Sequence, residues 1–242
     1  MDCSAATTLL ARTAGLGEYF ALPATGDPTC LPVAELLRES VIENFIGRTH
    51  HAISASMNCD PGDIPVRLAA SSFQLGVAAK ILSPVIGAAI CYSAIPIITA
   101  NSLKWRPVQH SVEFAVDTVE SVPATNADQI AATISQTVLS EILTPFNDTV
   151  CSVATLSPKV AWGNVSSAAN GAVTVLAMTH PEFERAGRTL VQALLSSGPL
   201  KATGAFEAGS FTRRSCCLFY QAPRSGLCGD CVLAASQQGP QH

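Results

Sequence analysis

The chain has 242 residues, of which 48% are hydrophobic and 13% are charged, with a formal net charge of −4. This length suits one large domain with a small appendage, and the apolar content is ample for a large core. The acidic balance and the lack of any lysine- or arginine-rich block exclude nucleic acid as a predicted partner.

The first thirty residues are small and rich in threonine, alanine and glycine, so we predict a loosely ordered segment over residues 1–30. The opening MDCSAATTLLARTAGLG has no basic region and no continuous apolar run, so we expect no secretory signal and a cytoplasmic location. Because cytosolic thiols stay reduced, the nine cysteines are expected to be free core residues or ligands.

Helical signals begin at residue 32. Apolar residues at three- and four-residue spacing predict a helix over residues 32–47. The composition of NCDPGDIP, residues 58–65, predicts a turn. A second helix is expected over residues 66–82, and Ser83-Pro84 resembles the start of a third.

Residues 81–103 carry no charge and are long enough to span a bilayer. Pro84 and Pro96 interrupt this stretch, and Lys80 and Lys104 flank it symmetrically, so it carries no orientation signal. We interpret it as a buried core helix followed by an extended segment. Peripheral association with the inner face of the cytoplasmic membrane stays open.

The pattern changes after Pro96. Val112, Phe114 and Val116 alternate with Glu113, Ala115 and Asp117, which predicts a half-buried strand over residues 112–117, and residues 103–108 are expected to pair with it as a hairpin or an edge. An apolar stripe then follows Asn126, which is a predicted helix cap with Gln129 three residues on. Further helix starts are predicted at Thr144-Pro145, Ser157-Pro158 and His180-Pro181, the last helix ending near residues 198–199.

The predicted fold is mainly α with a small antiparallel β element, in the α+β class. We expect a helical body over residues 31–205, a short cysteine-rich segment over residues 206–235 and a disordered tail over residues 236–242.

Four of the nine cysteines lie near the end of the chain, at Cys216, Cys217, Cys228 and Cys231. Their spacing is C-C-x10-C-x2-C. A C-x2-C spacing lets two thiolates face one centre across a tight turn, and Gly229 permits the backbone geometry of such a turn. The intervening APRSG can double back, so all four sulfurs could converge.

Soft thiolates select zinc or an iron–sulfur cluster. Zinc ribbons usually present two C-x2–4-C pairs, which the adjacent cysteines here do not provide. Adjacent Cα atoms lie only about 3.8 Å apart and their side chains tend to diverge, which a cluster of two metal atoms accommodates more easily. The spacing alone leaves three hypotheses open: a 2Fe–2S cluster, a zinc ion, and a thiol or disulfide relay.

The segment FTRRSCCLFYQAPRSGLCGDCVL resembles the C-terminal signature of the FhuF-type ferric-siderophore reductases, in which this cysteine pattern holds a 2Fe–2S cluster. Residues 67–90, RLAASSFQLGVAAKILSPVIGAAI, and residues 160–172, VAWGNVSSAANGA, resemble helices of the same family. The likeness covers most of the chain after about residue 35. It implies that the ligands of the cluster are Cys216, Cys217, Cys228 and Cys231.

The resemblance implies a reductase that passes one electron from a 2Fe–2S cluster to the iron of a ferric siderophore, of hydroxamate or similar type, and so releases Fe(II) for assimilation. A ferredoxin or an NAD(P)H reductase is the implied electron donor, since the sequence has no dinucleotide fingerprint. The alternative is a non-catalytic siderophore- or partner-binding module with a structural four-cysteine zinc site. A siderophore synthetase fits less well, because no ATP-binding loop is visible.

Arg213 and Arg214 directly precede the first two cysteines. Guanidinium groups there could tune the potential of an anionic cluster, contact a siderophore carboxylate or face solvent. The stretch Trp162 to Asn164 is a candidate docking surface, but a core position with Gly163 allowing close packing is favoured.

Two features outside this segment are interpreted as structural. Cys91 and Cys151 lie in apolar helical stretches and are expected to be buried hydrophobic residues. His50 and His51 look like a metal-binding pair, but adjacent side chains on a helix diverge, so we predict no metal there.

Overall fold

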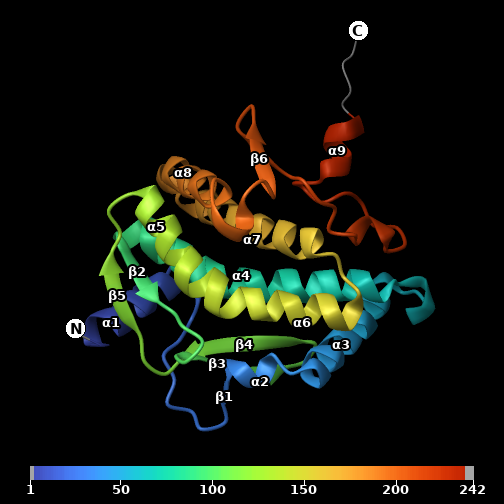
Figure 1. Cartoon of the computed structure of the whole chain (residues 1–242), viewed down its shortest axis with the longest axis horizontal. Coiled ribbons are helices and arrows are strands. Elements are labelled where there is room, and N and C mark those ends of the chain that lie inside the picture. The colour runs from blue at the N-terminus through green and yellow to red at the C-terminus, as the bar shows by residue number, and fades with distance from the viewer. Residues whose placement is uncertain (1–2, 238–242) are drawn as a thin grey trace.

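The computed structural model describes residues 3–237, which form a helical body with small antiparallel sheets at its edges (Figure 1). A long helix, α4 (Val66–Tyr92), runs through the middle of the body. Helices α3 (Glu39–Met57), α6 (Thr144–Ala154) and α7 (Pro158–Thr179) pack around it. The predicted class, mainly α with a small antiparallel β element, is therefore confirmed.

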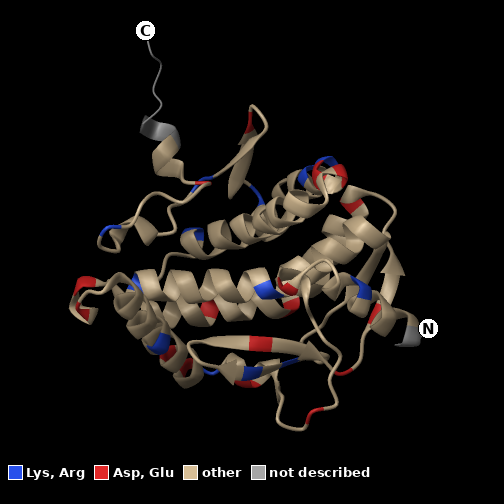
Figure 2. Ribbon diagram, turned by 180° about the vertical axis from the view of Figure 1, so that it is seen from behind, with Lys and Arg blue, Asp and Glu red and all other residues tan. Residues whose placement is uncertain are grey.

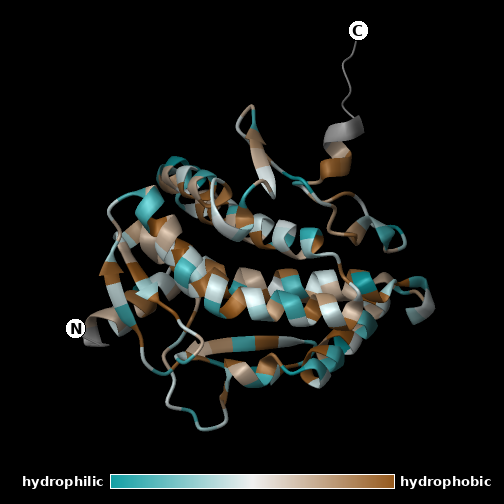
Figure 3. Cartoon of the chain, viewed as in Figure 1, coloured by the Kyte–Doolittle hydropathy of each residue, from teal (hydrophilic) through white to brown (hydrophobic). Residues whose placement is uncertain are grey.

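Helix α4 is apolar on nearly all sides, as expected for a helix enclosed by others (Figure 3). It is the one helix of the described chain that is long and apolar enough to cross a membrane, yet most of its most apolar stretch is buried inside the protein. Strand β2 (Ala94–Ile97) follows it. The interpretation of residues 81–103 as a core helix followed by an extended segment is therefore confirmed.

Pro84 lies inside α4, so the prediction of a new helix starting at Ser83-Pro84 is wrong. Proline has no N–H, so the carbonyl four residues before it loses its usual helical donor. In α4 that carbonyl belongs to Lys80. The hydroxyl of Ser83 donates to the neighbouring carbonyl, that of Ala79, at 2.7 Å, a bond that the helix accommodates. Residues 81–89 are all buried, and this packing holds the helix continuous through the proline.

The single helix predicted over residues 32–47 is wrong in its bounds. Helix α2 (Val33–Leu36) is one turn long, and Arg38 is extended, with φ −68° and ψ 132°, before α3 begins. Helix α3 then continues through Gly47, because a glycine weakens a helix by only about 1 kcal/mol, too little to end one that packs against α4. It ends where Asn58 adopts a left-handed conformation, and the turn predicted over residues 58–65 is confirmed.

A small sheet covers one side of the body, below α4 in Figure 1. Strands β3 (Leu103–Val108) and β4 (Ser111–Val116) form the predicted antiparallel hairpin, and the two-residue strand β1 (Leu31–Pro32) adds to β3. A separate antiparallel pair joins β2 to β5 (Glu120–Pro123). The alternation over residues 112–117 therefore identified β4, and the expected pairing of residues 103–108 with it is confirmed as a hairpin.

The second half of the chain begins with a continuous helical run. Asn126 caps α5 (Ala127–Ile134), as predicted, and accepts the backbone N–H of Gln129 at 2.9 Å. A π-helical stretch (Ser135–Leu143) leads directly into α6, which begins at Thr144 as predicted. Proline is tolerated there because it falls in the first turn of α6, where its missing N–H costs little.

The two remaining predicted helix starts are confirmed. Ser157 caps α7 and accepts the backbone N–H of Lys159 at 3.3 Å. After a 3-10 turn (Pro181–Phe183), α8 (Glu184–Leu195) runs back along α7. Helices α4, α7 and α8 together form the surface on which the C-terminal segment lies.

The expectation that residues 1–30 are loosely ordered is wrong for most of this segment. Helix α1 (Cys3–Ala14) and the 3-10 turn η1 (Glu18–Phe20) pack against α4. Phe20 is fully buried, and a Cβ at Gly87 would lie 2.8 Å from its Cδ1 atom, so the small residue on α4 makes room for this ring. Weak periodicity hid this element, although Ala6, Leu9 and Leu10 of α1 are buried.

The cysteine-rich segment begins with a hairpin of β6 (Gly204–Glu207) and β7 (Ser210–Arg213). A loop containing the 3-10 turn η6 (Phe219–Gln221) leads to α9 (Val232–Gln237).

Charged residues are sparse on the central helices and lie mainly at the periphery (Figure 2). Most of the tail predicted to be disordered, residues 238–242, lies outside the described residues, and the division into domains stays a prediction.

Candidate functional site

The four cysteines of the C-terminal motif lie on the loop that follows β7. The Sγ atoms of Cys217 and Cys228 are 3.6 Å apart. Cys216 Sγ accepts the backbone N–H of Leu218 at 3.3 Å, and the N–H of Cys231 donates to the carbonyl of Cys228 at 3.2 Å. The loop therefore doubles back as predicted and brings one member of each cysteine pair into contact.

The 3.6 Å separation of Cys217 and Cys228 suits a shared metal atom. Two thiolates at about 2.3 Å from one tetrahedral metal lie about 3.8 Å from each other. Within residues 3–237, however, no group of three or more His, Cys, Asp or Glu side chains is arranged to hold a metal ion. One pair of the predicted ligands is thus in contact, and Cys216 and Cys231 do not complete a metal site with it.

The electrostatics of the loop favour a thiolate at Cys217. Its hydrogen bond with Cys228 lowers the pKa of Cys217 to about 6, and the backbone N–H of Phe219 and the charge of Arg213 act in the same direction. The same hydrogen bond raises the pKa of Cys228, and burial raises the pKa of Cys216. A metal ligand must be a thiolate, so Cys217 is the sulfur best prepared for one.

Arg213 is almost completely buried, with a relative exposure of 1%. Its guanidinium donates to the side-chain oxygen of Asn164, and its Nε donates to the carbonyl of Ser215 at 2.7 Å. The alternatives in which Arg213 faces solvent or contacts a siderophore carboxylate are therefore wrong for this residue. Arg214 is exposed. Strand alternation explains the difference, since Phe211 and Arg213 point inward from β7.

Asn164 connects the cysteine loop to both central helices. Its side-chain nitrogen donates to the carbonyl and hydroxyl oxygens of Ser71 at 3.0 and 2.9 Å, and to Gln74 Oε1 at 2.9 Å. The Ser71 hydroxyl in turn donates to the carbonyl of Cys217 at 2.8 Å. A buried network from α4 and α7 thus fixes Arg213 on one side and the backbone of Cys217 on the other.

Residues 213–233 match the FhuF 2Fe-2S C-terminal domain. The range begins at the buried arginine and includes all four cysteines, so the predicted resemblance to the FhuF-type family is confirmed there. It indicates an iron–sulfur cluster as the cofactor and points to the family of iron-siderophore reductases. No curated protein matches the chain. The resemblance of residues 67–90 and 160–172 to helices of the family stays a prediction.

Gly163 explains how residues 213–233, called the FhuF-type segment from here on, approach α7 so closely. A Cβ at this position would lie 2.0 Å from the Ser215 Oγ atom and 3.6 Å from a terminal nitrogen of Arg213. The Ser215 hydroxyl is buried and has no hydrogen-bond partner in the described structure. Gly163 and Asn164 are therefore packing and anchoring residues, as the core interpretation predicted, whereas Trp162 is only partly buried against the core.

Replacing Gly163 with alanine is expected to destabilise the attachment of the FhuF-type segment by about 1–3 kcal/mol, because the new methyl group overlaps Ser215. The matched control is Gly76→Ala on α4, where nothing lies within 4 Å of the added Cβ. This control should stabilise the protein by up to about 1 kcal/mol, since alanine favours helices. Urea unfolding followed by circular dichroism measures both, and equal effects would contradict the packing role of Gly163.

The cysteines outside the FhuF-type segment belong to the body. Cys91 and Cys151 are partly buried against the core, and burial is the main reason why the pKa of each rises to about 11. Cys30 and Cys59 are also partly exposed free thiols. The prediction of buried hydrophobic residues therefore holds only in part, because Cys91 and Cys151 keep some contact with solvent.

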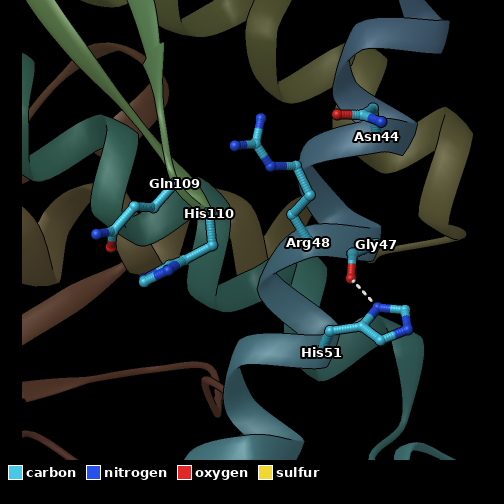
Figure 4. Close-up of a pocket in the computed structure, with 6 residues that line it drawn as sticks. All are labelled: Asn44, Gly47, Arg48, His51, Gln109 and His110. Carbon is cyan, nitrogen blue, oxygen red and sulfur yellow. Dashed lines mark hydrogen bonds between the residues drawn. The ribbon is translucent and has the colours of Figure 1, made fainter.

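The two adjacent histidines are used separately. His50 Nε2 lies 2.7 Å from the carbonyl of Ile64, and His51 Nδ1 lies 2.7 Å from the carbonyl of Gly47. His51 also lines a cavity of about 660 Å³ with Arg48 and His110, between α3 and the turn after β3 (Figure 4). None of its lining residues belongs to the FhuF-type segment.

Proposed function

We propose that this protein is a ferric-siderophore reductase in which Cys216, Cys217, Cys228 and Cys231 hold a 2Fe–2S cluster. The observation that carries the proposal is the match of residues 213–233, combined with the contact between Cys217 and Cys228. The thiol donor set fits the group, since iron–sulfur clusters are held by cysteine thiolates. When bound, such a cluster supplies electrons one at a time.

One electron is what the release of siderophore iron requires. A hydroxamate or similar siderophore holds Fe(III) through hard oxygen atoms, and the larger, less charged Fe(II) is held much more weakly. No bond of the organic ligand has to break. The role of the chain is to bind the ferric complex near the cysteine loop and to keep the loop in place through the Arg213 and Asn164 contacts.

The electron must come from another protein, a ferredoxin or an NAD(P)H reductase, in the cytoplasm or at the inner face of its membrane. Cys216 and Cys228 are partly exposed, whereas Cys217 and Cys231 are buried. The exposed side of the loop therefore offers a place for a donor protein to dock, and the buried side is fastened to the body.

The test uses the full chain, isolated without oxygen and reduced with dithionite that is then removed. Mixed with a ferric trihydroxamate, the protein should be reoxidised while a ferrous chelator traps Fe(II). A protein that keeps its electron and yields no Fe(II) would refute the proposal. A colourless protein with one bound zinc would instead support the alternative, a structural zinc site in a siderophore- or partner-binding module.

A further inference from the structure

A polar cavity of about 570 Å³ lies directly beside the turn that joins Cys228 to Cys231. Gly229 and Asp230, the two residues of that turn, form one wall. Helices α7 and α8 and the β6–β7 hairpin form the others, and these elements lie together at the top of Figure 1. Among the cavities described for this chain, it is the one whose wall includes the two residues between Cys228 and Cys231.

The polar side chains of this cavity are held in place by their neighbours. The hydroxyl of Ser167 on α7 donates to an Asp230 carboxylate oxygen, so the turn is tied to the helix. Arg188 on α8 donates to Thr174 Oγ1 and to Glu184 Oε1, both at 3.2 Å, and also to Asn170. Ordered polar groups reduce the entropy that a ligand must lose on binding.

Aromatic and small residues complete the lining. Tyr19 and Phe211 contribute ring surface, and Gly171 on α7 leaves the floor open. A Cβ at Gly171 would lie 3.5 Å from the Tyr19 hydroxyl, so only a glycine keeps the full width there. A mixed apolar and polar wall around a volume of this size is typical of sites for small organic ligands, which occupy about 300–1,000 Å³.

We propose that this cavity binds the ferric siderophore, an inference that rests on the reductase function proposed above. A ligand seated there contacts Gly229 and Asp230, the two residues between Cys228 and Cys231. A cluster held by the four cysteines would supply one electron to Fe(III), which would become Fe(II), and the external donor protein would then return one electron to that cluster. The balance is one electron in and one electron out.

The charges around the cavity restrict which ferric complex can enter. Asp230 and Glu184 carry two negative charges against the one positive charge of Arg188, so the charged side chains of the lining are negative on balance. A trianionic ferric complex, such as a tris-catecholate, is therefore repelled, whereas an uncharged or cationic complex is accepted. The cavity thus selects by charge as well as by size.

The experiment blocks the cavity with tryptophan and measures binding of a redox-inert probe to the cluster-loaded full chain. Ser210 is exposed on β7 and lines the cavity, so Ser210→Trp is expected to weaken binding of an uncharged Ga(III) trihydroxamate about tenfold or more. Thr174→Trp, from an exposed position on α7, should do the same from the opposite wall. The control is Ser152→Trp, an exposed serine on α6 outside the cavity, which should leave binding unchanged.

Unchanged cluster absorption in the variants shows that they fold. If Ser210→Trp loses the cluster, the binding measured with Thr174→Trp decides whether the cavity is the siderophore site. If the wild type reduces the ferric complex and both blocked variants bind the probe normally, the cavity is not the siderophore site, while the proposed reductase function stands. A wild type that reduces no ferric siderophore refutes the function itself. Equal binding of the uncharged complex and a trianionic Ga(III) tris-catecholate would overturn the selection by charge.

Discussion

Replacing Cys228 with serine is expected to abolish the iron–sulfur absorption and the EPR signal of the anaerobically isolated, reduced protein. Cys228 lies 3.6 Å from Cys217, the sulfur whose thiolate the loop stabilises most, so the change removes one half of the pair that is already in contact. A serine hydroxyl stays protonated at neutral pH and is a poor ligand for iron in a cluster. Iron content per chain should fall to near zero.

The helical body should survive this substitution. The main hydrophobic core is built from residues of the helices and sheets and contains none of the four cysteines. Helical circular dichroism of Cys228→Ser should therefore match that of the wild type. Cys30→Ser, a partly buried thiol outside the loop, is the control and should retain the cluster. Unfolding of Cys228→Ser would show that the protein depends on this site in order to fold, and a retained cluster would show that Cys228 is not a ligand.

The main features of the fold could be predicted from local patterns. The alternation over residues 112–117 identified a strand, and the cap at Asn126 was predicted from its residue type and the glutamine three positions on. The proline in α4 was misread because a local rule places it at a helix start, whereas burial on all sides keeps the helix intact. Tertiary packing, which no local pattern reports, decided that position.

The candidate site shows the same division. The four cysteines could be found from their spacing, because ligand chemistry fixes both residue type and separation. The anchoring network could not, since Asn164 and Ser71 are far from the loop in sequence and nothing in their own neighbourhood marks them as partners. Arg213 was the one member with a usable signal. Its place two residues after the inward-facing Phe211 on β7 predicts an inward side chain.

The inward position of Arg213 also changes what a charge beside the cysteines can do. An exposed guanidinium is screened by water and salt, whereas a buried one acts through a lower dielectric. The charge of Arg213 already helps to lower the pKa of Cys217, so it favours negative charge on the loop. Because reduction adds one electron to an anionic cluster, the same charge should stabilise the reduced form and raise the potential.

Replacing Arg213 with methionine is therefore expected to loosen the FhuF-type segment and lower the reduction potential together. The change leaves the Asn164 side-chain oxygen and the Ser215 carbonyl without their donor, at about 1–3 kcal/mol for each buried group. Cluster loss on exposure to a chelator should be at least about tenfold faster, the rate equivalent of 1.4 kcal/mol. Arg214→Met, the exposed neighbour, should show neither effect.

Arg213→Lys separates the two roles of this residue. Lysine keeps the positive charge but lacks the planar guanidinium that reaches both Asn164 and Ser215. The variant should therefore have a reduction potential close to that of the wild type and still lose the cluster faster than the wild type. Redox titration followed by EPR gives the potential, and chelator kinetics give the attachment. If Arg213→Met and Arg214→Met behave alike in both measurements, the buried guanidinium neither holds the loop nor tunes the cluster. If Arg213→Lys and Arg213→Met have the same reduction potential, the hydrogen-bond geometry of Arg213 rather than its charge sets that potential.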